Sequence, residues 1–164
     1  MINLKKILCP VDLSVASMLA LRSANAVAGR YGATLTIIHV LENPHFDIPG
    51  GETGTFSFGE LVELYREERK EEILDVLRHK GAVTVQFDIL FKEGVPYDEI
   101  TKTAREINSD MIIMSTCTKA HGLLAGCTTE RVVRLAPCPV LSVQTNKEGV
   151  KALNDIMDTD PNAK

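Results

Sequence analysis

The fold of this chain is decided by residues 7 to 14, which read Ile7-Leu-Cys-Pro-Val-Asp-Leu-Ser14. The first five residues form a short apolar run, which is typical of a parallel strand buried on both faces. Asp12 and Ser14 follow the run, and both residue types favour the N-cap position, immediately before the first residue of a helix. The stretch therefore predicts a buried strand that leads directly into a helix.

The residues that follow repeat this alternation of strand and helix. From Val15 to Tyr31 apolar positions recur every three or four residues, and Gly32 ends the predicted helix. The β-branched run Ala33 to Val40 predicts a second strand, parallel to the first because a helix connects them. Similar patterns predict helices over 60–80, 96–108 and 128–136 and strands over 84–91, 111–114 and 140–143.

Two of these later elements have features of their own. The helix over residues 60–80 carries many charges and places Leu64 and Ile73 on one apolar side. The strand over residues 84–91 alternates apolar with polar positions, whereas the other strands are nearly all apolar. Alternation of that kind predicts an edge strand.

Five strands that alternate with four helices predict the α/β class. The expected architecture is an open, parallel, Rossmann-like sheet of five strands with helices on both faces. Such sheets bind ligands beyond the carboxyl ends of their strands, at the point where the strand order reverses. The ends of the first, second and fourth strands are therefore the places to look for a binding site.

The composition limits the classes of partner. The chain has 164 residues and a formal net charge of −4, from 18 basic and 22 acidic residues, without a basic cluster. This balance argues against nucleic acid and anionic membrane surfaces as partners. No apolar run is long enough for a signal peptide or a membrane span, so we expect a cytoplasmic protein with reduced thiols. We expect one domain over residues 1–145 and a polar tail over residues 146–164.

Several stretches together carry a family resemblance, and the last of them is specific enough to be recognised alone. They are Lys6-Ile-Leu-Cys-Pro-Val-Asp12-Leu-Ser14, His39-Val40, Gly94-Val-Pro96 with Glu99-Ile100, and Asp110-Met-Ile-Ile-Met-Ser-Thr through Thr129-Glu-Arg-Val-Val-Arg-Leu-Ala-Pro-Cys-Pro-Val-Leu-Ser-Val143. Over residues 2 to 145 the chain resembles the universal stress protein family. The resemblance implies the adenine nucleotide alpha hydrolase-like fold with strand order 3-2-1-4-5. It also implies a homodimer that forms through the last strand, Val140 to Val143.

For the nucleotide-binding branch, the resemblance implies ATP or AMP at the junction of the first and fourth strands. A magnesium ion bound to the nucleotide would be the only metal. In the family, the residue at Asp12 accepts hydrogen bonds from the ribose or adenine, and the backbone at Val40 meets adenine. The site residues implied in this sequence are Pro10, Val11, Asp12, Val40, Met114, Ser115, Thr118, Gly126, Cys127 and Thr128.

The phosphate-binding loop departs from the family pattern G-x2-G-x9-G-[ST]. Ser115 and Thr118 replace the first two glycines, seven residues separate Thr118 from Gly126, and Cys127 replaces the hydroxyl residue. Hydroxyl groups, Thr129 included, and a helix N-terminus still offer hydrogen bonds to an anion. Side chains at the glycine positions would hinder close approach of phosphate to the backbone. Two hypotheses stay open: a protein that binds AMP or ATP, and an adaptor without nucleotide that acts by dimerisation and protein contacts.

Other chemistry has weaker support in the sequence. Cys117, His121 and Cys127 share a spacing that matches no standard zinc site, so we predict no metal centre. A redox pair of Cys117 and Cys127 remains an alternative to two ordinary thiols. Asp12 could equally cap the following helix, as could Ser14. No catalytic triad or carboxylate pair occurs, so we expect a stress-response binding protein rather than an enzyme.

Overall fold

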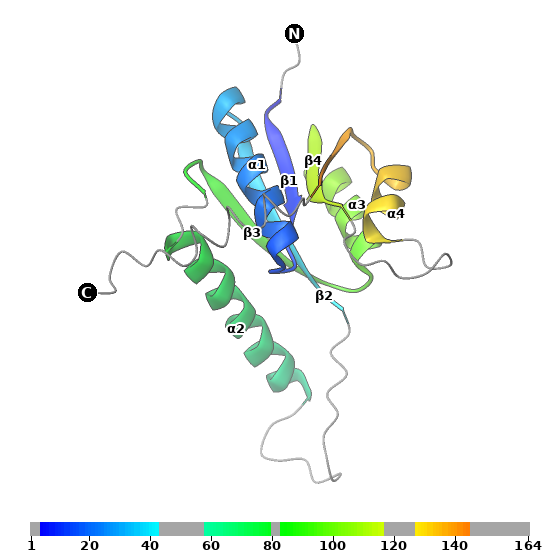
Figure 1. Ribbon diagram of the computed structural model, residues 1–164. Coiled ribbons are helices and arrows are strands. Elements are labelled where there is room, and N and C mark those ends of the chain that lie inside the picture. Colours follow the sequence, from blue (N-terminus) through cyan, green and yellow to red (C-terminus); the bar gives the residue numbers. More distant parts are fainter. Residues whose placement is uncertain (1–3, 43–57, 80–82, 117–126, 145–164) are drawn as a thin grey trace, which may run out of the picture.

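The computed structural model describes residues 4–42, 58–79, 83–116 and 127–144 (Figure 1). The predicted tail, residues 146–164, lies outside this part. The elements are β1 (Lys6–Pro10), α1 (Val15–Tyr31), β2 (Thr34–Leu41), α2 (Phe58–His79), β3 (Phe87–Glu93), α3 (Pro96–Glu106), β4 (Met111–Ser115), α4 (Thr128–Leu135) and β5 (Val140–Val143). None of the helices within these ranges combines the length and the apolar character needed to cross a membrane.

The strands form one parallel sheet in the order β3-β2-β1-β4-β5, which confirms the predicted topology. β1 lies at the centre, where Ile7 is opposite Leu35 of β2 and Met111 of β4. The chain passes from β1 outward to β3 and then returns to β4 on the other side of β1. The strand order therefore reverses between β1 and β4, where a ligand is expected.

The predicted edge strand is confirmed as an edge, but its bounds were wrong. β3 begins at Phe87 and ends at Glu93, rather than spanning residues 84–91. The side-chain oxygen of Asn25 in α1 accepts hydrogen bonds from the backbone of Thr84 at 2.8 Å and of Val85 at 3.3 Å. The backbone N–H groups of Thr84 and Val85 therefore bond to α1, and the strand begins two residues later, at Phe87.

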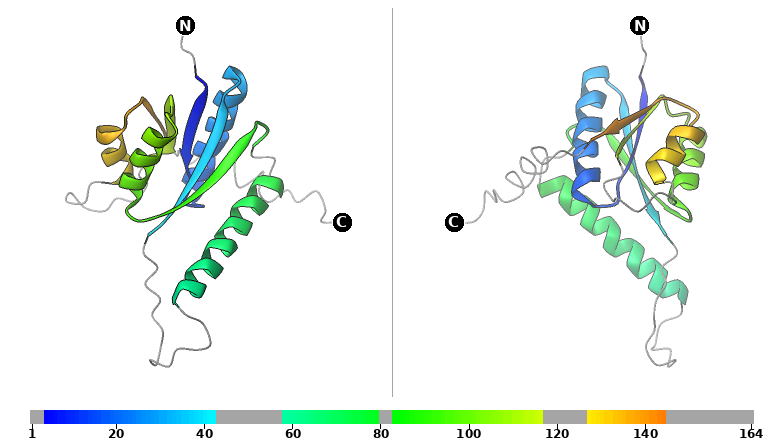
Figure 2. Two further views of the ribbon diagram at one scale, coloured as in Figure 1. Left: turned by 180° about the vertical axis from the view of Figure 1, so that it is seen from behind. Right: turned by 45° about the vertical axis from the view of Figure 1, so that its right-hand side comes forward.

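The core has two layers because successive strand residues point to opposite faces of the sheet. On one face, Ile7 packs with residues of α1 and with Ile73 of α2; on the other, Leu8 packs with residues of α3 and α4. Figure 2 shows α1 on the opposite side of the sheet from α3 and α4. Helices therefore cover both faces, as predicted.

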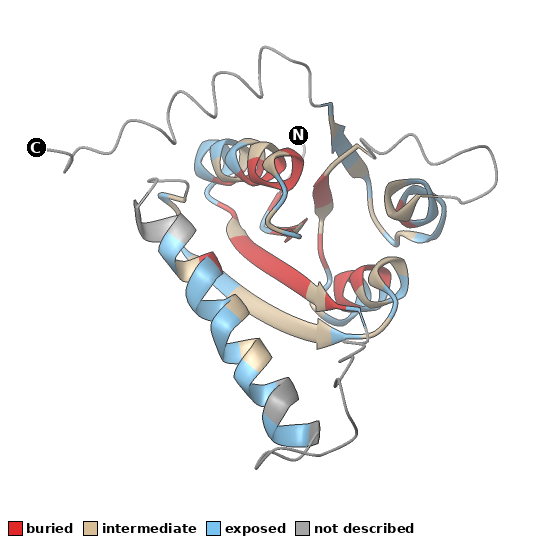
Figure 3. Cartoon of the chain, turned by 60° about the horizontal axis from the view of Figure 1, so that its bottom comes forward, coloured by how far each residue is buried: buried red, intermediate tan, exposed pale blue. Residues whose placement is uncertain are grey.

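The second helix packs less closely than its apolar pattern predicts. Ile73 is buried, but Leu64 is 62% exposed, so its expected place on the inner side was wrong. Figure 3 shows that most of α2 for which burial is described is exposed. An ion pair from Arg66 to Glu93 links its middle to the end of β3. Among the residues of α2 whose burial is described, Ile73 is therefore the one that joins the core.

Candidate functional site

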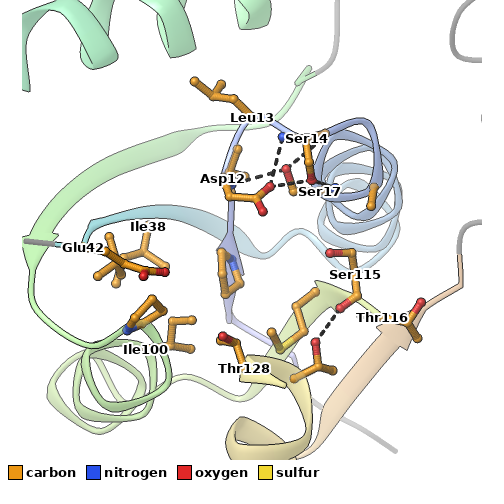
Figure 4. A pocket seen from close by; sticks show the side chains of 17 residues that line it. Asp12, Leu13, Ser14, Ser17, Ile38, Glu42, Ile100, Ser115, Thr116 and Thr128 are labelled. Carbon is orange, nitrogen blue, oxygen red and sulfur yellow. Dashed lines mark hydrogen bonds between the residues drawn. The ribbon is translucent and has the colours of Figure 1, made fainter. Parts of the chain in front are cut away.

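A pocket of about 610 Å³ lies at the carboxyl ends of β1, β2 and β4 (Figure 4). Seven of the residues predicted from sequence line it: Pro10, Val11, Asp12, Val40, Met114, Ser115 and Thr128. Cys127 is not among the lining residues, and Thr118 and Gly126 lie outside the described part of the chain. The structure thus brings seven of the ten residues that were predicted from the sequence into one pocket.

The turn between β1 and α1 is held by a chain of polar contacts. The backbone N–H of Ser14 donates to the Asp12 carboxylate at 3.0 Å, and the Ser14 hydroxyl donates to the same oxygen. That hydroxyl also accepts the backbone N–H of Ser17 at 3.2 Å, which makes Ser14 the N-cap of α1. Asp12 is therefore not the cap itself: its carboxylate orients the residue that is.

The electrostatics of Asp12 favour its ionised form. Partial burial raises the pKa of the carboxyl group, but hydrogen bonds from Ser14 and Ser17 outweigh this effect and hold the pKa below its ordinary value. The Asp12 carboxylate therefore stays charged at neutral pH and can accept a further hydrogen bond from a ligand hydroxyl or amine.

The backbone on either side of Asp12 is also constrained. Leu13 has a φ of 63°, which costs a non-glycine residue roughly 1–2 kcal/mol. On the other side, the Val11 carbonyl accepts a hydrogen bond from Nδ1 of buried His39 at 2.7 Å. The Val11 N–H donates to Ile38 at 2.9 Å. These contacts hold Asp12 in place before any ligand arrives.

The polar side of the pocket is built from the end of β4 and the start of α4. The Thr129 hydroxyl donates to the backbone carbonyl of Ser115 at 2.9 Å, which joins the two elements. Cys127 occupies the N-cap position of α4 without a side-chain hydrogen bond to the helix. The first turn of α4 therefore presents backbone N–H groups without a side-chain cap, next to the hydroxyls of Thr116 and Thr128.

The opposite side of the pocket comes from β2 and α3 and is mostly apolar. Ile38 and Val40 lie in β2, while Pro96 and Ile100 lie in the first turns of α3. The N–H of Gly94 donates to the Leu41 carbonyl at 3.0 Å, which fixes α3 beside the end of β2. Gly94 has a φ of 137°, a conformation that favours glycine.

Sequence reasoning did not single out several lining residues for binding. They are Leu13, Ser14, Ala16, Ser17, Ile38, Glu42, Pro96, Ile100 and Thr116. Glu42 is the most informative omission, because it brings a second carboxylate into the pocket. Its place directly after the second strand could have revealed it, since ligands contact the carboxyl ends of such strands.

The described residues contain no group of three or more His, Cys, Asp and Glu side chains that could hold a metal ion. The predicted redox alternative involves Cys117, which lies outside those residues. Cys9 in β1 is fully buried, and burial raises the pKa of its thiol, so this thiol is poorly reactive.

A family model, described as the universal stress protein family, matches residues 3–144. This chain belongs to the universal stress protein family. It is 32% identical over 147 residues to a universal stress protein of Methanocaldococcus jannaschii, covering 88% of this chain and 84% of that one. The family, the five-stranded fold and the strand order predicted from the sequence are therefore confirmed.

Solved structures agree with this assignment. The hypothetical protein MJ0577 superposes with a TM-score of 0.69 and 26% identity, over 88% of this chain and 99% of that one. Two more distant structures share the fold. A universal stress protein in complex with cAMP has a TM-score of 0.62 and 20% identity, over 88% and 99% of the two chains. One from Archaeoglobus fulgidus in complex with dAMP has a TM-score of 0.56 and 21% identity, over 87% and 98%.

Proposed function

We propose that this protein is a cytoplasmic regulatory protein of the stress response, not an enzyme, and that it binds an adenine mononucleotide. The binding domain would span residues 1–145 and hold the nucleotide in the pocket beyond β1, β2 and β4. The observation that carries the proposal is the divided lining of this pocket. One side is apolar, the other offers hydroxyls and a helix start, and the Asp12 carboxylate lies between them. Base, ribose and phosphate each need one of these three environments.

Each part of the nucleotide then has a partner of suitable chemistry. The base would lie against Ile38 and Ile100, beside the backbone of Val40. A ribose hydroxyl would donate to Asp12, whose carboxylate has spare acceptor capacity. The phosphate would meet the hydroxyls near Ser115 and Thr128 and the first N–H groups of α4, since a helix N-terminus favours negative charge.

Two sets of observations support this assignment. Two structures with the same fold are complexes with cAMP and dAMP, both of which are adenine nucleotides with one phosphate. The strand order also reverses at the pocket of this chain, which is where ligands of open α/β sheets bind. Residues Thr118, Gly126 and Cys127 remain proposed phosphate neighbours, and a magnesium ion would enter only together with the nucleotide.

The test has two arms. Purified protein is denatured and the supernatant is separated by chromatography, with released AMP, ADP or ATP as the expected result. Protein freed of nucleotide is then titrated with AMP in a calorimeter, and saturable binding with one site per chain is expected. If no nucleotide is released and AMP gives no heat of binding, the nucleotide hypothesis is wrong and the adaptor hypothesis gains support.

We also propose that the protein forms a homodimer through β5. Such a dimer is expected both for a nucleotide-binding protein and for an adaptor that binds no nucleotide. Strand β5 is an edge of the sheet, and its Leu141 side chain is 43% exposed. An apolar edge strand leaves backbone donors and acceptors open to a second copy.

The register of β5 identifies the variant that tests this dimer. The carbonyl of Pro139 accepts the N–H of Ile112 in β4 at 3.0 Å, and the carbonyl of Val143 accepts the N–H of Thr116, just after β4, at 2.9 Å. Along a strand, the backbone N–H and C=O groups of successive residues point alternately to the two neighbouring strands. The backbone groups of Leu141 therefore also face β4, and those of Ser142 face the open edge of the sheet. Ser142→Pro should therefore yield a monomer by sedimentation, whereas Ser142→Ala should stay dimeric. A dimeric Ser142→Pro would place the interface elsewhere.

A further inference from the structure

The described lining of the pocket carries negative charge and no positive side chain. It includes two carboxylates, those of Asp12 and Glu42, and neither lysine nor arginine. A phosphate monoester carries a charge of about −1.5 to −2 at pH 7, so these carboxylates would repel it. The dipole at the start of α4 supplies only about half a positive charge against this repulsion. A phosphate in this pocket would therefore be stabilised by a cation at the pocket edge.

Arg131 of α4 extends toward that edge. It follows the lining residue Thr128 by three positions, so the two side chains are neighbours on one face of the helix. The side chains of a helix tilt toward its N-terminus, which turns Arg131 toward the first turn of α4. The start of α4 is also the part of the helix that lines the pocket.

An aromatic ring of α3 holds the side chain of Arg131 in this region. The central carbon of its guanidinium lies 4.7 Å from the centre of the Tyr97 ring. Tyr97 follows the lining residue Pro96 and packs in the same core layer as Ile100, which also lines the pocket. Figure 2 shows α3 and α4 side by side on one face of the sheet. The guanidinium therefore lies between the starts of these two helices, beside the pocket.

The other basic side chains of α3 and α4 already have polar partners. Lys102 lies 3.8 Å from Glu99, Arg134 lies 3.1 Å from Glu130, and Arg105 donates to the Leu135 carbonyl at 2.8 Å. Arg131 differs, because within the described ranges no hydrogen bond or ion pair engages its guanidinium.

Contact with a ring face leaves the N–H groups of Arg131 available. A guanidinium has five such donors, in a planar fork that matches the oxygen atoms of a phosphate. A purely structural role explains Arg131 less well, since an exposed contact of a cation with a ring contributes little to stability. Arg105 already links α3 to the end of α4.

We propose that Arg131 is a phosphate-binding residue, which Tyr97 holds at the pocket edge and whose guanidinium donates to the phosphate of the bound nucleotide. This inference rests on the proposed function and adds the cation that selects phosphorylated over unphosphorylated ligands. Arg131 is exposed, so its replacement should leave the fold intact.

The test compares AMP with adenosine, which lacks the phosphate, in calorimetric titrations at low ionic strength, where charge interactions are least screened. In Arg131→Gln the affinity for AMP should fall about tenfold, whereas that for adenosine should change by less than about twofold. Arg131→Lys keeps the charge but loses the planar fork, so its affinity for AMP should lie between those of the wild type and Arg131→Gln.

A matched control separates a phosphate contact from a general change of charge. Arg134→Gln removes the same charge from α4, at a residue that pairs with Glu130 and does not line the pocket. This variant should keep the wild-type ratio of the two affinities. If Arg131→Gln also keeps that ratio, or if Arg134→Gln lowers it equally, the assignment of Arg131 is wrong. If the wild-type protein binds neither AMP nor adenosine, the proposed function itself fails, and with it this inference.

Discussion

Helices α1 and α4 both begin at the pocket, but they complete their first turns in different ways. In α1, the Ser14 hydroxyl accepts the N–H of Ser17 at 3.2 Å. The backbone bond of the first turn is the same in both helices: the Ser14 carbonyl accepts the N–H of Met18 at 3.0 Å, and the Cys127 carbonyl accepts the N–H of Arg131 at 3.2 Å. In α4, the N-cap residue Cys127 makes no side-chain hydrogen bond to the helix. Within the described residues, a side chain therefore satisfies one N–H in the first turn of α1 but none at the N-cap of α4.

This difference assigns separate tasks to the two turns. The β1–α1 turn is preorganised by hydrogen bonds among Asp12, Ser14 and Ser17. These bonds fix the Asp12 carboxylate in one position. The start of α4 offers hydrogen-bond donors and the positive end of a helix dipole, which suit an anion. Recognition of a neutral hydroxyl would belong to the first turn, and recognition of a phosphate to the second.

The largest effect is expected from removal of the fixed carboxylate. Asp12→Ala should weaken AMP binding by roughly 10–150-fold, since hydrogen bonds to charged groups contribute about 1.5–3 kcal/mol. Calorimetric titration of the variant measures this loss.

The matched control is Asp110→Ala. The Asp110 carboxylate accepts hydrogen bonds from the backbone of Lys5 at 2.7 Å and of Lys6 at 2.9 Å, and it does not line the pocket. This variant should lose stability but bind AMP as the wild-type protein does. Equal AMP affinity in Asp12→Ala and wild type would remove Asp12 from the site.

The second effect concerns the cap of α1. Ser14→Ala should lower the free energy of unfolding by about 1 kcal/mol, because the N–H of Ser17 loses its acceptor. Urea denaturation measures the change. Ser23→Ala is the control, since the Ser23 hydroxyl donates to the Leu19 carbonyl within α1 and the loss of this bond should cost little. Equal stability losses in the two variants would mean that Ser14 has no special role as a cap.

The sequence predicts the elements well where one physical pattern dominates. The helix Val15–Tyr31 and the strand Val140–Val143 have the predicted bounds, and Gly32 ends α1 in the left-handed conformation. Where a distant side chain intervenes, prediction fails: Asn25 binds the backbone of Thr84, and β3 starts three residues late.

Prediction of the site was limited in a similar way. The family resemblance implied Asp12 and Val40 and the strand-end position suggested them, and both line the pocket. Pro96 and Ile100 line the pocket beside a hydrogen bond from the Gly94 N–H to the Leu41 carbonyl, a contact between segments far apart in the sequence. Glu42 carries no motif, and its place directly after the second strand was the one signal in the sequence that could have indicated it.

The third effect is a dependence of stability on pH. Hydrogen bonds from Lys5 and Lys6 hold the pKa of Asp110 below its ordinary value of 3.8, as those from Ser14 and Ser17 do for Asp12 despite partial burial. The unfolded chain binds protons more readily, so this stabilisation is present above pH 3.8 and is lost as the pH falls through the folded pKa values. Urea titrations between pH 6 and pH 2 should show a shallower decline in Asp12→Asn and Asp110→Asn than in wild type. Parallel curves for all three proteins would contradict the contribution of these carboxylates.

The smallest effect is expected in the choice between ATP and AMP. The proposed phosphate site at the start of α4 would hold one phosphate, but Ser115 and Thr118 stand where the family pattern has glycines. Seven rather than nine residues separate Thr118 from Gly126. Without those glycines the backbone is less able to approach the outer phosphates. ATP should therefore bind within tenfold of AMP, a difference below about 1.4 kcal/mol, in calorimetric titrations at one magnesium concentration. A preference for ATP above tenfold would mean that residues beyond the start of α4 also hold the outer phosphates, and that the donors of α4 are only part of the phosphate site.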